Sequence, residues 1–159
     1  MADTAHDIDF TDIEGRPLPL SNYCGKVLLV VNTASACGLT PQYAGLEQLW
    51  RDYRDRGLVV LGVPSNDFAG QEPGSEAEIK TFCETAFGVD FPLTSKVKVL
   101  GDDAHPFYRW AREHMGEAGE PKWNFHKILL DKAGQPIDGF GPRTSPTDPA
   151  VTAAIEAAL

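Results

Sequence analysis

A cysteine stands between a run of β-forming residues and a predicted helix, in the stretch VVNTASACGLTPQYAGL (residues 30–46). The apolar run KVLLVV at residues 26–31 is typical of a buried strand, and Thr40-Pro41 is typical of an N-cap followed by the first helical residue. Cys37 is therefore expected at or just before a helix N-terminus, where backbone N–H groups favour an anion and hence a nucleophilic thiolate. Taken alone, the stretch is equally compatible with a small buried cysteine that has no chemical role.

The surrounding pattern predicts the elements that would position this thiol. The helix that begins near Thr40 is expected to end at Gly57, a typical C-terminal cap, and a second buried strand follows at Leu58 to Val63. Next comes the loop PSNDFAGQEPGS, whose twelve residues exceed most connections in compact domains, and loops of that length are often functional. Ser75 then begins another helix, as half of a capping box with Glu78.

The rest of the pattern predicts an α/β fold with a mixed sheet. A short N-terminal hairpin turns at Glu14-Gly15, a helix spans roughly residues 106–115, two strands meet at a turn at residues 132–134, and a last helix covers the C-terminus. The order favours a parallel βαβ unit followed by an antiparallel hairpin, in a central sheet flanked by helices. Cys37 and the twelve-residue loop both fall at carboxyl ends of the parallel strands, where reactive groups gather in such sheets.

Length and charge limit the classes of function. A chain of 159 residues fits one domain, residues 1–159, and its formal net charge of -9 argues against nucleic-acid partners and against docking on anionic membranes. The longest apolar run, LVVLGV, is too short to span a bilayer. The opening MADTAHDIDF lacks the features of a secretion signal, which predicts a cytoplasmic protein, although a chain that begins after a removed leader would read the same.

Cysteine and histidine usage predicts neither a disulfide scaffold nor a metal site. The 3 cysteines are odd in number and contain no CxxC pair, and the 4 histidines are far from them in the sequence. Cys24, in a polar loop, is interpreted as an incidental thiol. We therefore expect no metal and no cofactor.

Three segments together resemble the glutathione peroxidase family. VNTASACGLT resembles the peroxidatic-cysteine motif, roughly VNVAS-x-C/U-G-x-T, and GVPSNDFAGQEPGS resembles the second signature, close to FPCNQFGxQEPGS. KWNFHKILLDKAG resembles the third, WNF-x-K-F-L-V-D. The segments occur in the family's order and spacing, and the likeness covers roughly residues 8–146. The usual PxxxTxxC arrangement of the peroxiredoxins is absent around Cys37.

The resemblance implies a thioredoxin-like fold and the reduction of hydrogen peroxide and organic hydroperoxides. Carried over, Cys37 is the peroxidatic residue, with cysteine in place of selenocysteine, and Trp123 and Asn124 are its indole and amide partners. The residue types suit this chemistry, because an indole N–H and an amide NH₂ can both stabilise a sulfur anion. Without the resemblance, Trp123 would be interpreted as a core aromatic residue and Asn124 as a turn residue.

The second segment departs from the family pattern at one position. Asp67 stands where the family usually has a glutamine donor. An ionised carboxylate only accepts hydrogen bonds, and its charge disfavours a nearby thiolate. Three arrangements are open: Asp67 points away, it is protonated and donates, or another group replaces it, for which Gln71 is a candidate.

A second cysteine matches the resolving cysteine of the thioredoxin-dependent branch of the family. Cys83 lies in EIKTFCETAFG, on the helix that Ser75 begins, and in that branch the helix partly unravels so that the two sulfurs meet. The resemblance thus implies a Cys37–Cys83 disulfide, for which thioredoxin is the expected reductant ahead of glutathione. The plainer alternative is that Cys83 is a buried apolar residue.

Two other functions fit the same residues. The chain could act as a peroxide sensor or redox relay that passes a disulfide to a partner, or as a non-catalytic thioredoxin-like module, which the departure at Asp67 makes conceivable. We predict the peroxidase, acting as a monomer.

Overall fold

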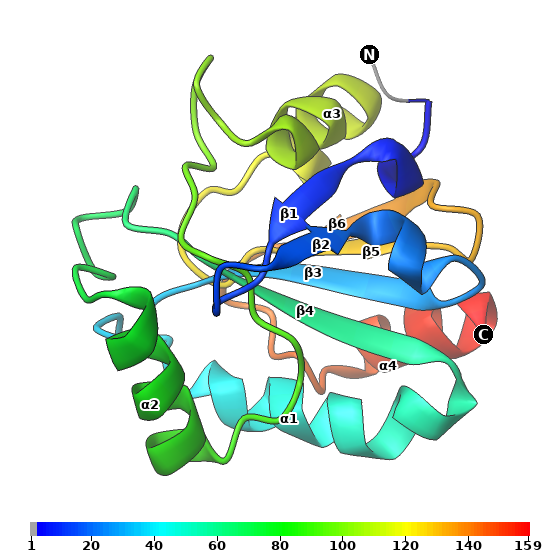
Figure 1. The fold of residues 1–159 in the computed structure, drawn as a ribbon. Coiled ribbons are helices and arrows are strands. Elements are labelled where there is room, and N and C mark those ends of the chain that lie inside the picture. The colour runs from blue at the N-terminus through cyan, green and yellow to red at the C-terminus, as the bar shows by residue number, and fades with distance from the viewer. Residues whose placement is uncertain (1–2) are drawn as a thin grey trace.

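A four-stranded mixed sheet forms the centre of the molecule in the computed structural model, which describes residues 3–159 (Figure 1). The strand order is β4-β3-β5-β6, with β3 parallel to β4 and antiparallel to β5, and β5 antiparallel to β6. The strands are β3 (Val27–Thr33), β4 (Leu58–Pro64), β5 (Lys127–Leu130) and β6 (Pro136–Phe140). The expected domain starts at residue 1, and residues 1 and 2 lie outside the described residues.

Helices and a hairpin cover the two faces of this sheet. In Figure 1, α1, α2 and α4 lie below the sheet, whereas α3 and the hairpin of β1 and β2 lie above it. Their bounds are β1 (Asp9–Thr11), β2 (Pro17–Pro19), α1 (Gln42–Tyr53), α2 (Glu76–Phe87), α3 (Pro106–Met115) and α4 (Pro149–Ala158). Short 3-10 helices span Ala5–Asp7, Leu20–Tyr23, Arg54–Arg56 and Gly116–Gly119.

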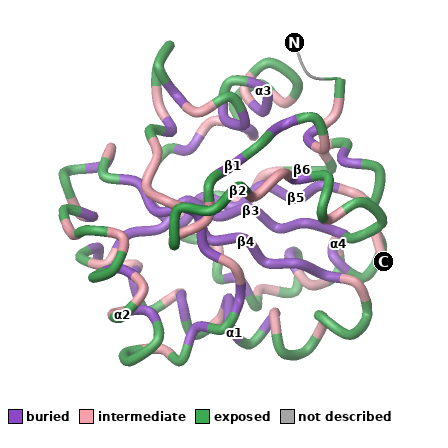
Figure 2. Tube along the Cα trace, viewed as in Figure 1, coloured by how far each residue is buried: buried purple, intermediate pink, exposed green. Residues whose placement is uncertain are grey.

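The sheet is apolar because it is covered on both sides. Every residue of β3, β4 and β5 is buried, as the purple strands of Figure 2 show. Side chains of β3 alternate between the two cores: Leu29 packs with α1, α2 and α4, and Leu28 packs with α3 and the N-terminal segment. A strand buried on both faces carries a continuous apolar run, which explains KVLLVV.

Most predicted elements are present. The parallel β3–β4 pair, the β5–β6 hairpin and the N-terminal hairpin are confirmed, and α3 has the predicted bounds. Ser75 and Glu78 form the predicted capping box at the start of α2. The bounds of α1 differ from the prediction: it begins at Gln42, with Pro41 at the N-cap position and no side-chain cap, and it ends at Tyr53. Gly57 caps the 3-10 helix that follows.

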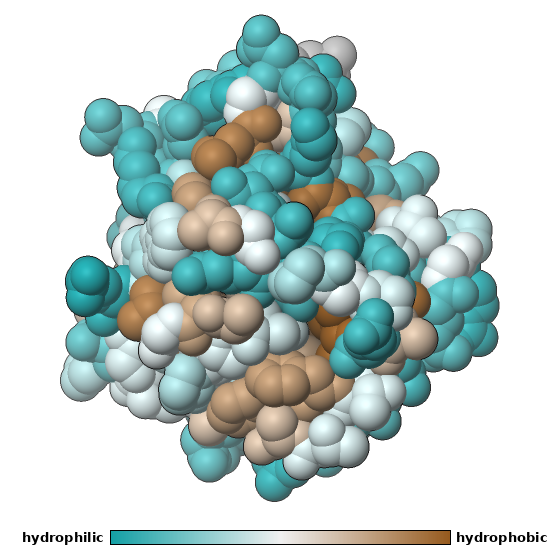
Figure 3. Space-filling view, turned by 90° about the vertical axis from the view of Figure 1, so that its left-hand side faces the viewer, coloured by the Kyte–Doolittle hydropathy of each residue, from teal (hydrophilic) through white to brown (hydrophobic). Residues whose placement is uncertain are grey.

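The surface is mainly hydrophilic. Figure 3 shows the face that carries α2, on which apolar side chains gather in the lower half of the view. Phe82 of α2 is half-buried and contributes to two shallow hollows on the surface. Between residues 3 and 159, no helix combines the length and the apolar character that crossing a bilayer requires.

Candidate active site

The sulfur of Cys37 accepts two hydrogen bonds at the carboxyl end of β3. Trp123 Nε1 donates to Cys37 Sγ at 3.2 Å, and the backbone N–H of Leu39 donates at 3.3 Å. The residue is 8% exposed, in a bend between β3 and α1. Two donors aimed at one sulfur can stabilise negative charge that develops on it during a reaction, including that of a sulfenate.

Thr40 fixes the loop that carries this sulfur. Its hydroxyl accepts a hydrogen bond from Cys37 N at 3.0 Å and donates to Ala34 O at 2.8 Å. The side chain that the sequence suggested as the cap of α1 therefore fixes the loop from Ala34 to Cys37. A short turn over residues 38–41 then connects this loop to α1.

Asn32, a residue that sequence reasoning missed, holds the segment that carries Trp123. Its Nδ2 donates to Trp123 O at 3.0 Å, its Oδ1 accepts from His126 N at 3.1 Å, and its backbone oxygen accepts from Phe125 N at 2.6 Å. Phe125 has a φ of 67°, a conformation that costs energy in a residue with a side chain. The available signal was a polar residue at the end of an apolar strand, because a buried amide requires partners.

Asn124 and Gln71 face each other beside this loop. Asn124 Nδ2 donates to Gln71 Oε1 at 2.9 Å, and the backbone oxygen of Gln71 accepts from Ala36 N at 3.0 Å, next to Cys37. Within residues 3–159, the hydrogen bonds to Cys37 Sγ come from Trp123 and Leu39. The two predicted amide side chains thus lie near the cysteine loop but bond to each other rather than to the sulfur.

The carboxyl group of Asp67 is hydrogen-bonded to the backbone of a distant segment. Its Oδ2 accepts hydrogen bonds from Val99 N at 2.7 Å and Leu100 N at 3.1 Å, so the carboxyl group anchors the segment that precedes α3. These bonds fit the first of the three arrangements that the sequence left open for Asp67, in which its carboxyl group is used away from Cys37.

We expect Asp67→Ala to lower stability without impairing the reaction of the thiol. Losing a charged acceptor of two backbone N–H groups should lower the free energy of unfolding by about 2 kcal/mol. The rate constant for hydrogen peroxide should change by less than about threefold, because no bond to Cys37 is lost. Urea unfolding and stopped-flow oxidation measure the two effects, and Asp67→Asn is the matched control. A rate reduced more than tenfold would show that Asp67 takes part in the chemistry.

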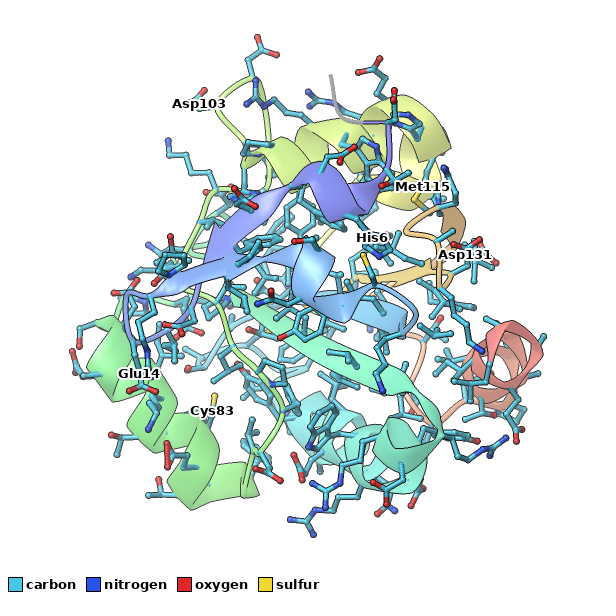
Figure 4. All side chains as sticks on the ribbon, turned by 45° about the vertical axis from the view of Figure 1, so that its right-hand side comes forward. His6, Glu14, Cys83, Asp103, Met115 and Asp131 are labelled. Carbon is cyan, nitrogen blue, oxygen red and sulfur yellow. The ribbon has the colours of Figure 1, made fainter. Side chains whose placement is uncertain are left out.

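Cys83 is completely buried on α2. Its side chain leaves the helix toward the interior of the molecule (Figure 4). It belongs to the same apolar cluster as Cys37, and both thiols are free. Burial raises the pKa of the Cys83 thiol to about 11. In this structure the thiol is protonated at neutral pH. Cys24, in contrast, is exposed.

A pocket of about 660 Å³ opens beside Cys37. Trp123 and Leu39 contribute its apolar surface, and the exposed side chains of Lys122 and Arg143 contribute positive charge. One wall is the segment of residues 141–144 that follows β6. The thiol therefore lies at a hollow large enough for an organic molecule.

The fold matches solved structures of thiol proteins. A structure described as "Trgpx in apo form" shares 35% identity with a TM-score of 0.79 and covers 99% of this chain and 96% of its own. A thioredoxin-family thiol:disulfide interchange protein from Chlorobium tepidum TLS has a TM-score of 0.69 at 18% identity, over 99% of this chain and 98% of its own. The fold is thioredoxin-like.

Sequence comparison agrees with the site. A glutathione peroxidase-like peroxiredoxin, gpx1, of Schizosaccharomyces pombe is 46% identical over 89% of this chain and 90% of its own length. Thioredoxin/glutathione peroxidase BtuE of Escherichia coli is 41% identical over 93% of both chains. The family model described as glutathione peroxidase matches residues 5–112. The chain therefore belongs to the glutathione peroxidase family.

Proposed function

We propose that this chain reduces hydroperoxides with Cys37 as the attacking thiol and Cys83 as the resolving thiol, and that thioredoxin reduces the resulting disulfide. Family membership makes the chain a cysteine-dependent peroxidase and favours an enzyme over the redox relay and the non-catalytic module. The observation that carries the residue assignment is the pair of donors, Trp123 Nε1 and Leu39 N, on Cys37 Sγ at the mouth of a pocket.

The first step oxidises Cys37. Its thiolate attacks one oxygen of the hydroperoxide, the O–O bond breaks, and the sulfur becomes a sulfenic acid while the other oxygen leaves as water or an alcohol after taking up a proton. Trp123 Nε1 and Leu39 N stabilise the anionic sulfur before attack. Asn124 and Gln71, which bond to each other, are proposed to orient the loop at Ala36 rather than to donate to the sulfur.

The second step forms the Cys37–Cys83 disulfide. The Cys83 sulfur attacks the sulfenic sulfur, the S–O bond breaks, and the hydroxyl leaves as water with the proton of Cys83. Burial and the pKa of about 11 keep Cys83 unreactive in the closed form, so α2 must open first. Lys96 secures the start of this helix: its Nζ donates to Glu72 O at 3.0 Å and to Gly74 O at 2.7 Å. Such local opening costs less than global unfolding.

The third step is reduction by a dithiol. An intramolecular disulfide is best reduced by a protein dithiol, which supports thioredoxin as the reductant, and the name of the Escherichia coli relative includes both thioredoxin and glutathione. Glutathione is the second candidate, because Lys122 and Arg143 at the pocket could bind its carboxylates. We propose a monomer as the working form, and the cytoplasm as its location, because thioredoxin keeps thiols reduced there.

Peptide mapping of the oxidised protein tests this assignment. One equivalent of hydrogen peroxide is added to fully reduced protein, remaining thiols are alkylated, and digested peptides are identified by mass spectrometry. We expect a linked peptide that contains Cys37 and Cys83, with Cys24 alkylated. Cys37 found as sulfenic or sulfinic acid beside a free Cys83 would remove the resolving step and favour glutathione. Unmodified Cys37 would overturn the proposal.

A further inference from the structure

Lys127 is a buried lysine that the proposed reaction does not use. It is the first residue of β5 and has 0% exposure. Its Nζ donates to three backbone oxygens, those of Gly141 at 3.3 Å, Pro142 at 3.1 Å and Thr144 at 2.5 Å. Burying an ammonium group costs free energy unless the group is hydrogen-bonded. The three carbonyl oxygens supply such partners to the buried charge of Lys127.

The three carbonyl groups belong to the wall of the pocket beside Cys37. Residues 141–144 line this pocket. They belong to neither a helix nor a strand, since β6 ends at Phe140 and α4 begins at Pro149. Gln42 adds a fourth hydrogen bond to this segment, because its Nε2 donates to Pro142 O at 2.6 Å. The position of the wall therefore depends on side chains from β5 and α1, and Lys127 makes most of these bonds.

We infer that Lys127 is a positioning residue: it holds the 141–144 segment in place beside Cys37 and thereby sets the preference of the site for large hydroperoxides over hydrogen peroxide. This inference rests on the proposed function. Hydrogen peroxide needs only the sulfur and its donors, Trp123 and Leu39. The organic part of a larger hydroperoxide must also fit against the wall, so displacement of the wall affects only the larger substrate.

The charge of Lys127 gives the preference a pH dependence. Burial lowers the pKa of this ammonium group to about 8. Other charged or titratable groups on the neighbouring segments are Lys122, His126, Arg143 and the exposed Asp138 of β6. Above pH 8 the charge-assisted bonds to the wall weaken, and the preference should fall. The unfolded chain holds this proton to higher pH, so the group's contribution to the free energy of unfolding rises between pH 8 and its ordinary pKa of 10.5. Deprotonation of Lys127 by itself therefore does not lower the free energy of unfolding over this pH range.

The test compares rate constants of oxidation for cumene hydroperoxide and hydrogen peroxide by stopped-flow. We expect Lys127→Met to lower the constant for cumene hydroperoxide about tenfold and that for hydrogen peroxide less than twofold. Lys127→Arg should restore part of the ratio of the cumene hydroperoxide constant to the hydrogen peroxide constant. Lys26→Met, at an exposed lysine before β3, should leave this ratio unchanged. An equal loss for both substrates, or an unchanged ratio, would overturn the inference.

Two further measurements keep the inference independent of variant folding and of peroxidase activity. If Lys127→Met does not fold, the ratio of the two rate constants in the wild-type protein between pH 7 and 9 decides, because it should fall through about pH 8. If the protein reduces no hydroperoxide, the proposed function fails, but labelling of Cys37 in a Cys24→Ser background still applies. In Lys127→Met, the rate of Cys37 labelling should fall more for the large reagent N-phenylmaleimide than for the small reagent methyl methanethiosulfonate. Equal changes in the two labelling rates would overturn the inference.

Discussion

Replacing Cys37 with serine is expected to lower the rate of hydroperoxide reduction by about 10³-fold or more, because a serine hydroxyl is not ionised at neutral pH and is a far weaker nucleophile than a thiolate. The bonds from Trp123 Nε1 and Leu39 N stabilise a sulfur anion, and a neutral hydroxyl gains little from them. The fold should be retained, since the side chain is small and lies in a bend.

Peroxide consumption in the presence of thioredoxin and its reductase measures this loss, with circular dichroism to verify folding. Cys24→Ser is the matched control, because Cys24 is exposed and should keep a rate within about twofold of wild type. A Cys37→Ser variant that retains a tenth of the activity would assign the attack to another cysteine.

Replacing Cys83 with serine is expected to separate the first turnover from the cycle. Cys37 should still react with one equivalent of peroxide at close to the wild-type rate, because Cys83 does not bond to Cys37 in the reduced structure. Steady-state turnover with thioredoxin should fall about 100-fold, since the sulfenic acid can no longer form the internal disulfide that a dithiol reduces.

Stopped-flow oxidation and a coupled thioredoxin assay give the two rates for Cys83→Ser. Trapping of the Cys37 sulfenic acid with dimedone should increase in this variant. Full turnover with thioredoxin would show that the reductant attacks Cys37 directly and that burial of Cys83 has only a structural role. Loss of both rates would instead point to damage of the core, because Cys83 packs in the cluster that contains Cys37.

The sequence predicted the parts of the fold that local pattern controls. The apolar run of β3 and the capping box of Ser75 and Glu78 each act over a few residues, and each is present. The order of strand and helix signals also predicted the mixed sheet, because short connections restrict topology.

Contacts between distant segments were not predictable in the same way. Asn32 bonds to residues more than 90 positions later, and the bonds of Lys127 depend on the path of the chain after β6. Asp67 shows the limit most clearly, because its residue type allowed three arrangements and only the position of Val99 and Leu100 selects one. Thr40 is a residue type that commonly caps a helix, but here its hydroxyl bonds to Cys37 N and Ala34 O instead.

The two cations at the pocket have a consequence for how molecules approach this protein. The formal net charge is -9, so the field around most of the molecule repels anions. Lys122 and Arg143 both line the pocket beside Cys37, which makes the pocket a local attractive region on a repulsive surface. Anionic molecules that diffuse toward the protein are attracted to the pocket beside the reactive thiol, and physiological salt confines this attraction to a distance of about 8 Å.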